Sequence, residues 1–233
     1  MNIALIGYGT MGRLVRAVAE AKGHLVNVVV NEAHAGLPAE QLSDTLRAAE
    51  VAIDFSSAEA VRRNVEACLA AGIPLVEGTT GWNDGRDEIE HLVNERGGTM
   101  VFGANFSISI NLFYKIAGRA AELFAKFPEY EVFIEEQHHS RKKDAPSGTA
   151  LKIKEILELS VEVPSVSATR AGSIPGTHRV GFDGKGDQIL LEHTARSREG
   201  FAAGAIMAAE WAVGKKGFFE FTEVIDEFSG VTG

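Results

Sequence analysis

Short apolar runs alternate with amphipathic segments through the first half of the chain. The apolar runs predict five strands, at Asn2–Ile6, Leu25–Val30, Val51–Phe55, Pro74–Glu77 and Thr99–Phe102. The segments between them predict helices at Met11–Ala21, around Val61, Val65, Cys68 and Leu69, and at Asp84–Arg96. Strands that alternate with helices over short connections are typical of a parallel sheet with helices on both faces. We therefore predict an α/β fold with a doubly wound parallel sheet.

The pattern changes after Asn105, where the long helical stretch Ser109–Phe127 has no strand close behind it. A second helical stretch covers Ala150–Leu159, and strand-like runs lie at Tyr130–Gln137, Ser165–Arg170, His178–Phe182 and Gln188–Thr194. The turn Asp183-Gly184-Lys185-Gly186 joins the last two runs and predicts a hairpin. Strands joined by hairpins, with helices on one side, predict a smaller α+β domain. The closing helix Gly200–Val213 and strand Phe218–Phe228 suit either domain on pattern alone.

Composition narrows the class of protein. The 233 residues carry a net charge of −9, which argues against broad binding to nucleic acid or to an anionic membrane. Cys68 is the single cysteine, so an intrachain disulfide is excluded and a thiolate zinc site is not expected. We find no pattern of a targeting segment and no apolar run of the roughly 20 residues that span a bilayer. A cytoplasmic protein is the expectation.

A glycine pattern follows the first predicted strand, since Gly7-Tyr8-Gly9-Thr10-Met11-Gly12 fits G-x-G-x-x-G and opens a helix. In this setting the first glycine permits a tight turn and the second lets the backbone approach a pyrophosphate. The third lets helix and strand pack closely, and the helix N-terminus adds amide donors. The motif predicts a Rossmann domain that binds a dinucleotide.

Asn31 and Glu32 follow the second predicted strand, about twenty residues beyond Gly12. An acidic residue there binds the adenosine ribose hydroxyls and repels a 2′-phosphate. No Arg or Lys occurs between Gly23 and Leu46, so a clamp for that phosphate is missing from this stretch. NADH is therefore favoured over NADPH, although Glu32 as a simple solvated loop residue stays an alternative.

The segment His138–Thr149 is the second chemically active cluster. Two imidazoles and three cations occupy the six residues from His138 to Lys143, and Ser147-Gly148-Thr149 then opens a helix whose free amides suit an anion. Histidines titrate near neutrality, and a lysine crowded by cations loses its proton more readily, so proton transfer to a carboxylate-bearing substrate is the expected chemistry. A metal-binding histidine pair and a solvated basic loop are the alternatives, and we predict no metal.

The string His138-His139-x-x-Lys142-x-Asp144-Ala145-Pro146-Ser147-Gly148-Thr149 closely resembles the signature of the dihydrodipicolinate reductase family. The resemblance spans the chain and includes the glycine loop, Asp54-Phe55-Ser56, Gly78-Thr79-Thr80-Gly81, Asn105-Phe106-Ser107 and Arg170-Ala171-Gly172. It implies reduction of 4-hydroxy-tetrahydrodipicolinate, through dihydrodipicolinate, to tetrahydrodipicolinate by NADH or NADPH, in the diaminopimelate route to lysine. It also implies a homotetramer built through the sheet of the second domain.

The family's residue roles can be carried over by position. They imply His138 and Lys142 as proton donors or acceptors, with His139, Gly148 and Thr149 on a substrate carboxylate. The implied cofactor contacts are Gly7, Tyr8, Gly9, Thr10, Met11, Gly12, Asn31, Glu32, Gly78, Thr79, Thr80, Gly103, Ala104, Asn105 and Phe106. Because the family's C-terminal tail returns to the Rossmann domain, the implied domains are 1–107 with 199–233, and 108–198. Beyond His193, Arg198 is placed to approach the dicarboxylate from the other side.

Two departures from the family bear on the choice of cofactor. The glycine loop is one residue shorter than in many relatives, and Asn31-Glu32-Ala33 lacks the basic residue that often follows the acid. Other interpretations are another Rossmann amino-acid or aldehyde dehydrogenase, or a non-catalytic NAD(H)-sensing protein. An aldehyde dehydrogenase needs a nucleophilic cysteine outside the nucleotide domain, whereas Cys68 lies on a helix within it. A sensor has no use for the histidine–lysine string.

Overall fold

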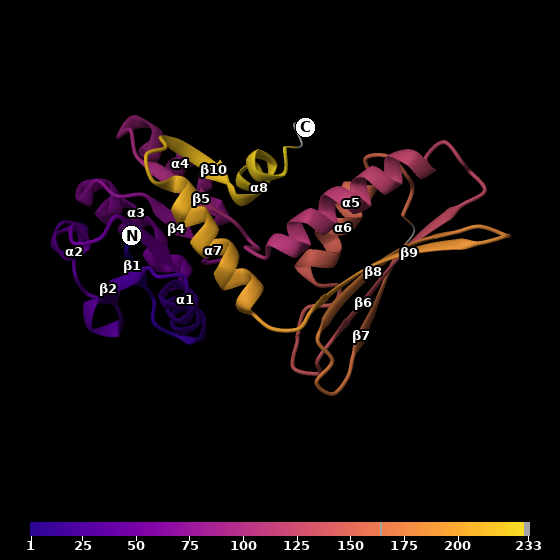
Figure 1. The fold of residues 1–233 in the computed structure, drawn as a ribbon, viewed down its shortest axis with the longest axis horizontal. Coiled ribbons are helices and arrows are strands. Elements are labelled where there is room, and N and C mark those ends of the chain that lie inside the picture. Colours follow the sequence, from indigo (N-terminus) through magenta and orange to yellow (C-terminus); the bar gives the residue numbers. More distant parts are fainter. Residues whose placement is uncertain (164, 231–233) are drawn as a thin grey trace. The chain divides into compact units, whose positions relative to one another are not determined.

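The computed structural model describes residues 1–163 and 165–230. The chain forms two compact units. The first combines Met1–Ile108 with the chain from Arg198 onwards, and the second is the continuous segment Ser109–Ser197. The first unit is therefore discontinuous in sequence, with the whole second unit inserted into it (Figure 1).

The first unit is built on a six-stranded sheet whose strand pairings are all parallel, in the order β10-β5-β4-β3-β1-β2. Its strands are β1 (Asn2–Ile6), β2 (Leu25–Val30), β3 (Val51–Asp54), β4 (Leu75–Glu77), β5 (Thr99–Phe102) and β10 (Gly217–Glu220). Strands β1, β3, β4 and β5 are almost entirely buried, as expected for the centre of a sheet covered on both faces. The predicted doubly wound α/β fold is confirmed.

Two hydrophobic clusters, one on each face, hold this sheet. One cluster joins α1 (Thr10–Ala21), α7 (Glu199–Ala212) and α8 (Phe221–Ser229) to one face of the sheet. The other joins α2 (Ala39–Leu46), α3 (Ala58–Ala71) and α4 (Arg86–Glu95) to the opposite face. Short 3-10 turns, η1 (Glu32–His34) and η2 (Asn83–Gly85), lie in the connections.

The C-terminal segment corrects one prediction. The apolar pattern predicts a strand over Phe218–Phe228, but the strand β10 ends at Glu220 and the helix α8 follows at once. The reason is periodicity, because Phe221, Val224 and Ile225 have the i, i+3, i+4 spacing of one helix face and all three are buried. Pattern reasoning also missed α2, which has only eight residues and buries few apolar side chains.

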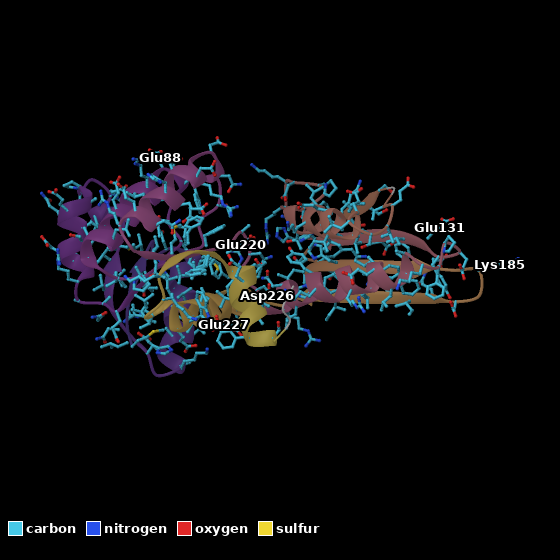
Figure 2. The ribbon with its side chains drawn as sticks, turned by 90° about the horizontal axis from the view of Figure 1, so that it is seen from above. Glu88, Glu131, Lys185, Glu220, Asp226 and Glu227 are labelled. Carbon is cyan, nitrogen blue, oxygen red and sulfur yellow. The ribbon has the colours of Figure 1, made fainter. Side chains whose placement is uncertain are left out.

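The second unit has a four-stranded mixed sheet in the order β7-β6-β8-β9. Its strands are β6 (Glu131–His138), β7 (Val166–Arg170), β8 (Gly176–Asp183) and β9 (Gln188–Ala195). The helices α5 (Ile108–Phe124) and α6 (Gly148–Leu157) cover one face (Figure 1). The β8–β9 hairpin forms as predicted, with Lys185 at its tip (Figure 2). However, β6 and β7 are parallel and are joined through α6, so only part of this sheet is built from hairpins.

The core of the second unit lies between the sheet and the two helices. Alternate residues of β6 and β8, including Ile134 and Phe182, face Phe113 on α5 and Ile153 on α6. The predicted α+β arrangement with helices on one side is confirmed. No helix within the described residues combines the length and the apolar character needed to cross a membrane.

Candidate active site

The glycine loop follows β1 at the point where the strand order reverses, because β1 pairs with β2 on one side and with β3 on the other. Such switch points at the carboxyl ends of parallel strands form the ligand crevice of open α/β sheets. Gly7 has φ +84°, and a Cβ there would lie 2.5 Å from the carbonyl oxygen of Phe55. A Cβ on Gly12 would lie 2.1 Å from the carbonyl oxygen of Gly7. Both positions therefore admit only glycine.

An apolar cavity opens beside this loop within the first unit. Its lining residues are Met11, Phe55, Gly78, Gly103, Ala104, Phe106, Arg198 and Phe201. The structure thus gathers the glycine loop and the turns after β4 and β5, as the motif positions predict. Phe55, Arg198 and Phe201 were not among the expected cofactor contacts. Arg198, expected near a dicarboxylate, is the only charged residue of this lining.

The loop after β2 is organised by Asn31, whose side chain accepts from the amide of Ala33 at 3.1 Å and contacts His34. Glu32 is exposed there. Arg63 reaches this loop from α3 and donates to the carbonyl oxygens of His34 and Ala35. The sequence argument counted only cations near Asn31 in the chain, so it missed Arg63. The Arg63 guanidinium is, however, already engaged with these carbonyls and with Asn64.

In the second unit, Glu136 is the centre of a buried polar cluster. Its side chain is fully buried, and its Oε1 accepts from Arg170 at 2.6 Å and from the backbone amide of Ser147 at 2.9 Å. Its Oε2 lies 3.3 Å from Nδ1 of His138 and 3.7 Å from Nε2 of His178. Strand register produces this convergence, because Glu136 pairs with His178 across β6 and β8.

The cluster keeps Glu136 charged and its histidines neutral. Burial opposes ionisation of Glu136, but the hydrogen bonds from Ser147 and Arg170 outweigh it and lower the pKa of that carboxyl. Burial lowers the pKa of His138, and the nearby Glu136 charge only partly offsets this effect. Burial, with the positive charge of a protonated His138 second, lowers the pKa of His178 to about 4. Both shifts favour neutral imidazoles near pH 7, and Nδ1 of His138 lies close to Glu136 without a hydrogen bond to it.

Lys142 and Asp144 form an ion pair at 2.9 Å beside this cluster. The hydrogen bond from Lys142 is the main reason that the pKa of Asp144 is lowered, and the backbone amide of Gly148 also contributes. The Oγ of Ser147 caps α6 by accepting from the amide of Ala150 at 3.2 Å. The first turn of α6 thus holds a carboxylate, that of Asp144, between an ammonium group and a helix N-terminus.

The remaining expected substrate contacts lie on the same segment. The hydroxyl of Thr149 makes a hydrogen bond with Tyr114 on α5. His139 is partly exposed directly after β6, and its carbonyl oxygen accepts from the amide of Lys142 at 3.1 Å. The structure therefore brings His138, Lys142 and the start of α6 into one region, and places Thr149 and His139 at its border.

Glu136, His178 and His193 were not singled out from the sequence, because they belong to three different strands. They lie at consecutive register positions of β6, β8 and β9. Only a prediction of sheet register would have found them.

Glu136, His138 and His178 also offer ligand atoms within 4.8 Å of one another. Arg170 already supplies a positive charge at Glu136, which disfavours a metal cation there.

The fold and these two sites define a class of protein. A glycine loop at the switch point of a doubly wound sheet is the arrangement of dinucleotide-dependent oxidoreductases. A separate unit carries the acid–base groups and the anion-binding helix terminus that a small anionic substrate requires.

Comparison with known proteins identifies the family. Residues 1–106 match the family model "Dihydrodipicolinate reductase, N-terminus" and residues 109–225 match "Dihydrodipicolinate reductase, C-terminus". The chain is 34% identical to a 4-hydroxy-tetrahydrodipicolinate reductase of Christiangramia forsetii, over 97% of this chain and 98% of that protein. It is 35% identical to the Archaeoglobus fulgidus enzyme of the same name, over 97% and 100%. The chain belongs to the dihydrodipicolinate reductase family, a family of oxidoreductases, and the expected resemblance is confirmed.

Solved structures agree on the fold. A dipicolinate-bound dihydrodipicolinate reductase from Paenisporosarcina is similar, with a TM-score of 0.76, 21% identity and coverage of 94% of this chain and 97% of that one. An amine dehydrogenase from Mycobacterium smegmatis has a TM-score of 0.61 at 8% identity, with coverage of 96% and 95%. The same two-unit fold therefore occurs in oxidoreductases of different substrates, and the substrate has to be argued from the site.

Proposed function

We propose that this chain reduces 4-hydroxy-tetrahydrodipicolinate, through its dehydrated form dihydrodipicolinate, to tetrahydrodipicolinate with NAD(P)H. The observation that carries the proposal is the cluster at the start of α6. There the Lys142 ammonium and the Gly148 amide contact the carboxylate of Asp144, and His138 lies nearby beside the charge of Glu136. A substrate with two carboxylates and a cyclic imine needs an anion site beside a proton donor. The relatives at 34% and 35% identity are named for this activity, which supports the proposal.

The chemistry requires one hydride and one proton. A dinucleotide held at the glycine loop would supply the hydride, which adds to C4 of the conjugated imine. The electron pair displaced from the ring carbons moves towards the nitrogen and leaves an enamine, which takes up a proton on carbon to give the product imine. The protein's part is to hold the two carboxylates, to orient the substrate for hydride transfer and to deliver that proton.

Lys142 is the better proton donor of the two candidate residues. The lowered pKa of His138 leaves its imidazole neutral near pH 7, whereas Lys142 stands as the cationic partner of Asp144. Nδ1 of His138 lies 3.3 Å from Glu136, and in this proposal Nε2 is the nitrogen that faces the substrate. In this proposal Lys142 donates the proton and His138 orients the substrate and passes a proton onwards.

A substrate carboxylate would take the place now held by Asp144. That position offers the Lys142 ammonium, the Gly148 amide and the dipole of α6, all of which favour an anion. The amide and the hydroxyl of Thr149 and the side chain of His139 complete the proposed carboxylate site. The Paenisporosarcina reductase is described as dipicolinate-bound, which supports binding of a planar dicarboxylate by this family.

NADH is the proposed preferred cofactor within a family that uses NAD(P)H. Glu32 is exposed beside the loop where an adenosine ribose would lie, and its charge repels a 2′-phosphate. Arg63, the cation that approaches this loop, is engaged by backbone carbonyls and by Asn64. The cofactor contacts expected from the sequence, the homotetramer and the cytoplasmic location also remain proposals.

A coupled assay tests the function directly. Synthase-generated 4-hydroxy-tetrahydrodipicolinate is supplied to the purified protein with NADH and NADPH in parallel, and loss of reduced cofactor is followed. We expect turnover with both cofactors and a kcat/KM for NADH at least equal to that for NADPH. Absence of turnover with either cofactor would reject the substrate assignment. A tenfold preference for NADPH would reject only the interpretation of the Glu32 loop.

A further inference from the structure

Two carboxyl side chains lie buried beneath the nucleotide site. Asp54 and Glu77 are the last residues of β3 and β4, and they are register partners on these adjacent parallel strands. Both residues have 0% solvent exposure. Within residues 1–163 and 165–230, neither forms an ion pair with a basic side chain. Two negative charges in this position would repel each other without compensation.

Hydrogen-bond donors serve three of the four carboxyl oxygens. Asp54 accepts from the amide of Ser56 at 2.8 Å and from the side-chain amide of Asn64 at 2.6 Å, one donor on each oxygen. Glu77 accepts from the amide of Thr79 at 2.7 Å through Oε1. Its Oε2 is buried and has no donor among the described residues, and Asp54 is its side-chain neighbour. A proton on Oε2 would satisfy this oxygen and bond it to Asp54.

The surroundings also favour one shared proton. Burial, and then the charge of Asp54, raise the pKa of Glu77 well above its usual value. Burial raises the pKa of Asp54 as well, but the hydrogen bonds from Ser56 and Asn64 oppose that rise. From α3, the facing titratable group is the buried thiol of Cys68, whose pKa burial raises well above its usual value. Arg63, also on α3, bonds to Asn64 and not to either carboxyl.

The two carboxyls anchor loops that line the cavity. Phe55 follows Asp54 and Gly78 follows Glu77, and both line the apolar cavity of the first unit. These loops pack so closely that a Cβ on Gly78 would lie 2.2 Å from the Phe55 ring. The Oγ1 of Thr79 also accepts from the amide of Ser56 at 3.1 Å. A change in the distance between the two carboxyls is therefore transmitted to both loops.

We propose that Glu77 is a positioning residue of the nucleotide site, a neutral carboxylic acid that shares one proton with Asp54 and thereby holds the loops after β3 and β4 together. The proposal rests on the assignment of this cavity to the dinucleotide. It makes no use of the substrate unit. Its test therefore measures cofactor binding and apo-protein stability, and neither measurement depends on the imine substrate.

The first measurement is the pH dependence of unfolding for wild type and Glu77→Gln, without cofactor. A carboxyl whose folded pKa is raised stabilises the protein fully below its unfolded pKa, and loses that contribution as the pH rises towards the folded pKa. Glutamine keeps a donor to Asp54 and an acceptor for Thr79 but does not titrate. As the pH rises above about 4.3, the usual pKa of glutamate, the unfolding constant of wild type relative to Glu77→Gln should therefore rise, with a limiting slope of about tenfold per pH unit. The exposed Glu40→Gln variant is the matched control and should show no such trend.

The second measurement is NADH affinity at pH 7 by fluorescence titration. Glu77→Leu lacks both hydrogen-bonding groups and should bind NADH at least tenfold more weakly than wild type. Glu77→Gln should stay within about twofold of wild type, because its amide replaces the shared proton. A ratio of unfolding constants that is flat with pH would overturn the protonated state, and this result does not require a folded Glu77→Leu. Equal NADH affinity of folded Glu77→Leu and wild type would overturn the positioning role.

Discussion

Glu136→Gln offers the sharpest test of the proposed catalytic unit. The substitution keeps the size and shape of a fully buried side chain and removes only its charge. Arg170, whose side chain is 16% exposed, then loses the carboxylate that it contacts at 2.6 Å. Breaking a buried ion pair from one side costs about 3–5 kcal/mol, because the remaining charge is left uncompensated. We expect a loss of stability of that size, measured by denaturant unfolding.

The same substitution should change catalysis through His138. Glu136 lies 3.3 Å from Nδ1 of that histidine, and its charge is the larger of two, with that of Asp144, that oppose the lowering of the His138 pKa by burial. In the Glu136→Gln variant, the His138 pKa should fall further. We expect kcat to fall by about 10²-fold, the low end of the range for general acid–base catalysis. The acidic limb of the kcat–pH profile should move to lower pH.

Two further variants make the result decisive. Glu135→Gln is the matched control, since the adjacent residue points to the opposite face of β6 and makes a partly exposed ion pair with Arg179 at 3.7 Å. It should leave stability and the pH profile nearly unchanged. Adding Arg170→Met to Glu136→Gln should restore part of the lost stability but not the pH profile. An unchanged pH profile in a stable Glu136→Gln enzyme would refute the proposed link between Glu136 and His138.

Three other predictions concern the same unit. Lys142→Ala and His138→Ala should each lower kcat by about 10²–10⁴-fold, while NADH affinity, measured by calorimetry, stays unchanged. Near-normal turnover of both variants would refute the acid–base assignment. Pyridine-2,6-dicarboxylate should inhibit competitively with the imine substrate, and Thr149→Val should weaken this inhibition at least tenfold, since hydrogen bonds to charged groups contribute about 1.5–3 kcal/mol. Tyr114→Phe, which removes the partner of the Thr149 hydroxyl, is the control, and equal inhibition constants for wild type and Thr149→Val would place the dicarboxylate elsewhere. Burial lowers the pKa of His178 to about 4, so the free energy of unfolding should decrease as the pH falls from about 6.5 towards 4. In His178→Gln this decrease should be smaller, as measured by denaturant unfolding at a series of pH values.

Local sequence patterns predicted the elements that are strongly periodic or bounded by glycine. The strand β1, the glycine loop and α1 occur as expected, because buried apolar runs and the G-x-G-x-x-G spacing leave few alternatives. The start of α6 was also readable from the residues alone, since Ser147-Gly148-Thr149 was predicted to open a helix. These features depend on neighbours within a few positions of the chain.

Features that depend on distant pairing were not readable in this way. The parallel pairing of β6 with β7 places Arg170 beside Glu136, although 34 residues separate them in sequence. The approach of Arg63 to the loop after β2 likewise depends on the packing of α3. The helix α8 was predicted as a strand because its apolar residues were read as one run with β10. A short apolar segment does not by itself distinguish the two structures.

The discontinuous first unit has a consequence for the order of events during synthesis. The second unit is continuous, so all of its strands and helices have been made once Ser197 leaves the ribosome. At that moment the nucleotide-binding sheet still lacks its edge strand β10 and the cover of α7 and α8. Apolar residues of β1 and β3, such as Ile3 and Ile53, then lack the α7 and α8 side chains that cover that face. The part of the protein that begins first is therefore the part that is completed last, and a ribosome that stalls near Arg198 leaves a finished substrate unit attached to an open, aggregation-prone sheet.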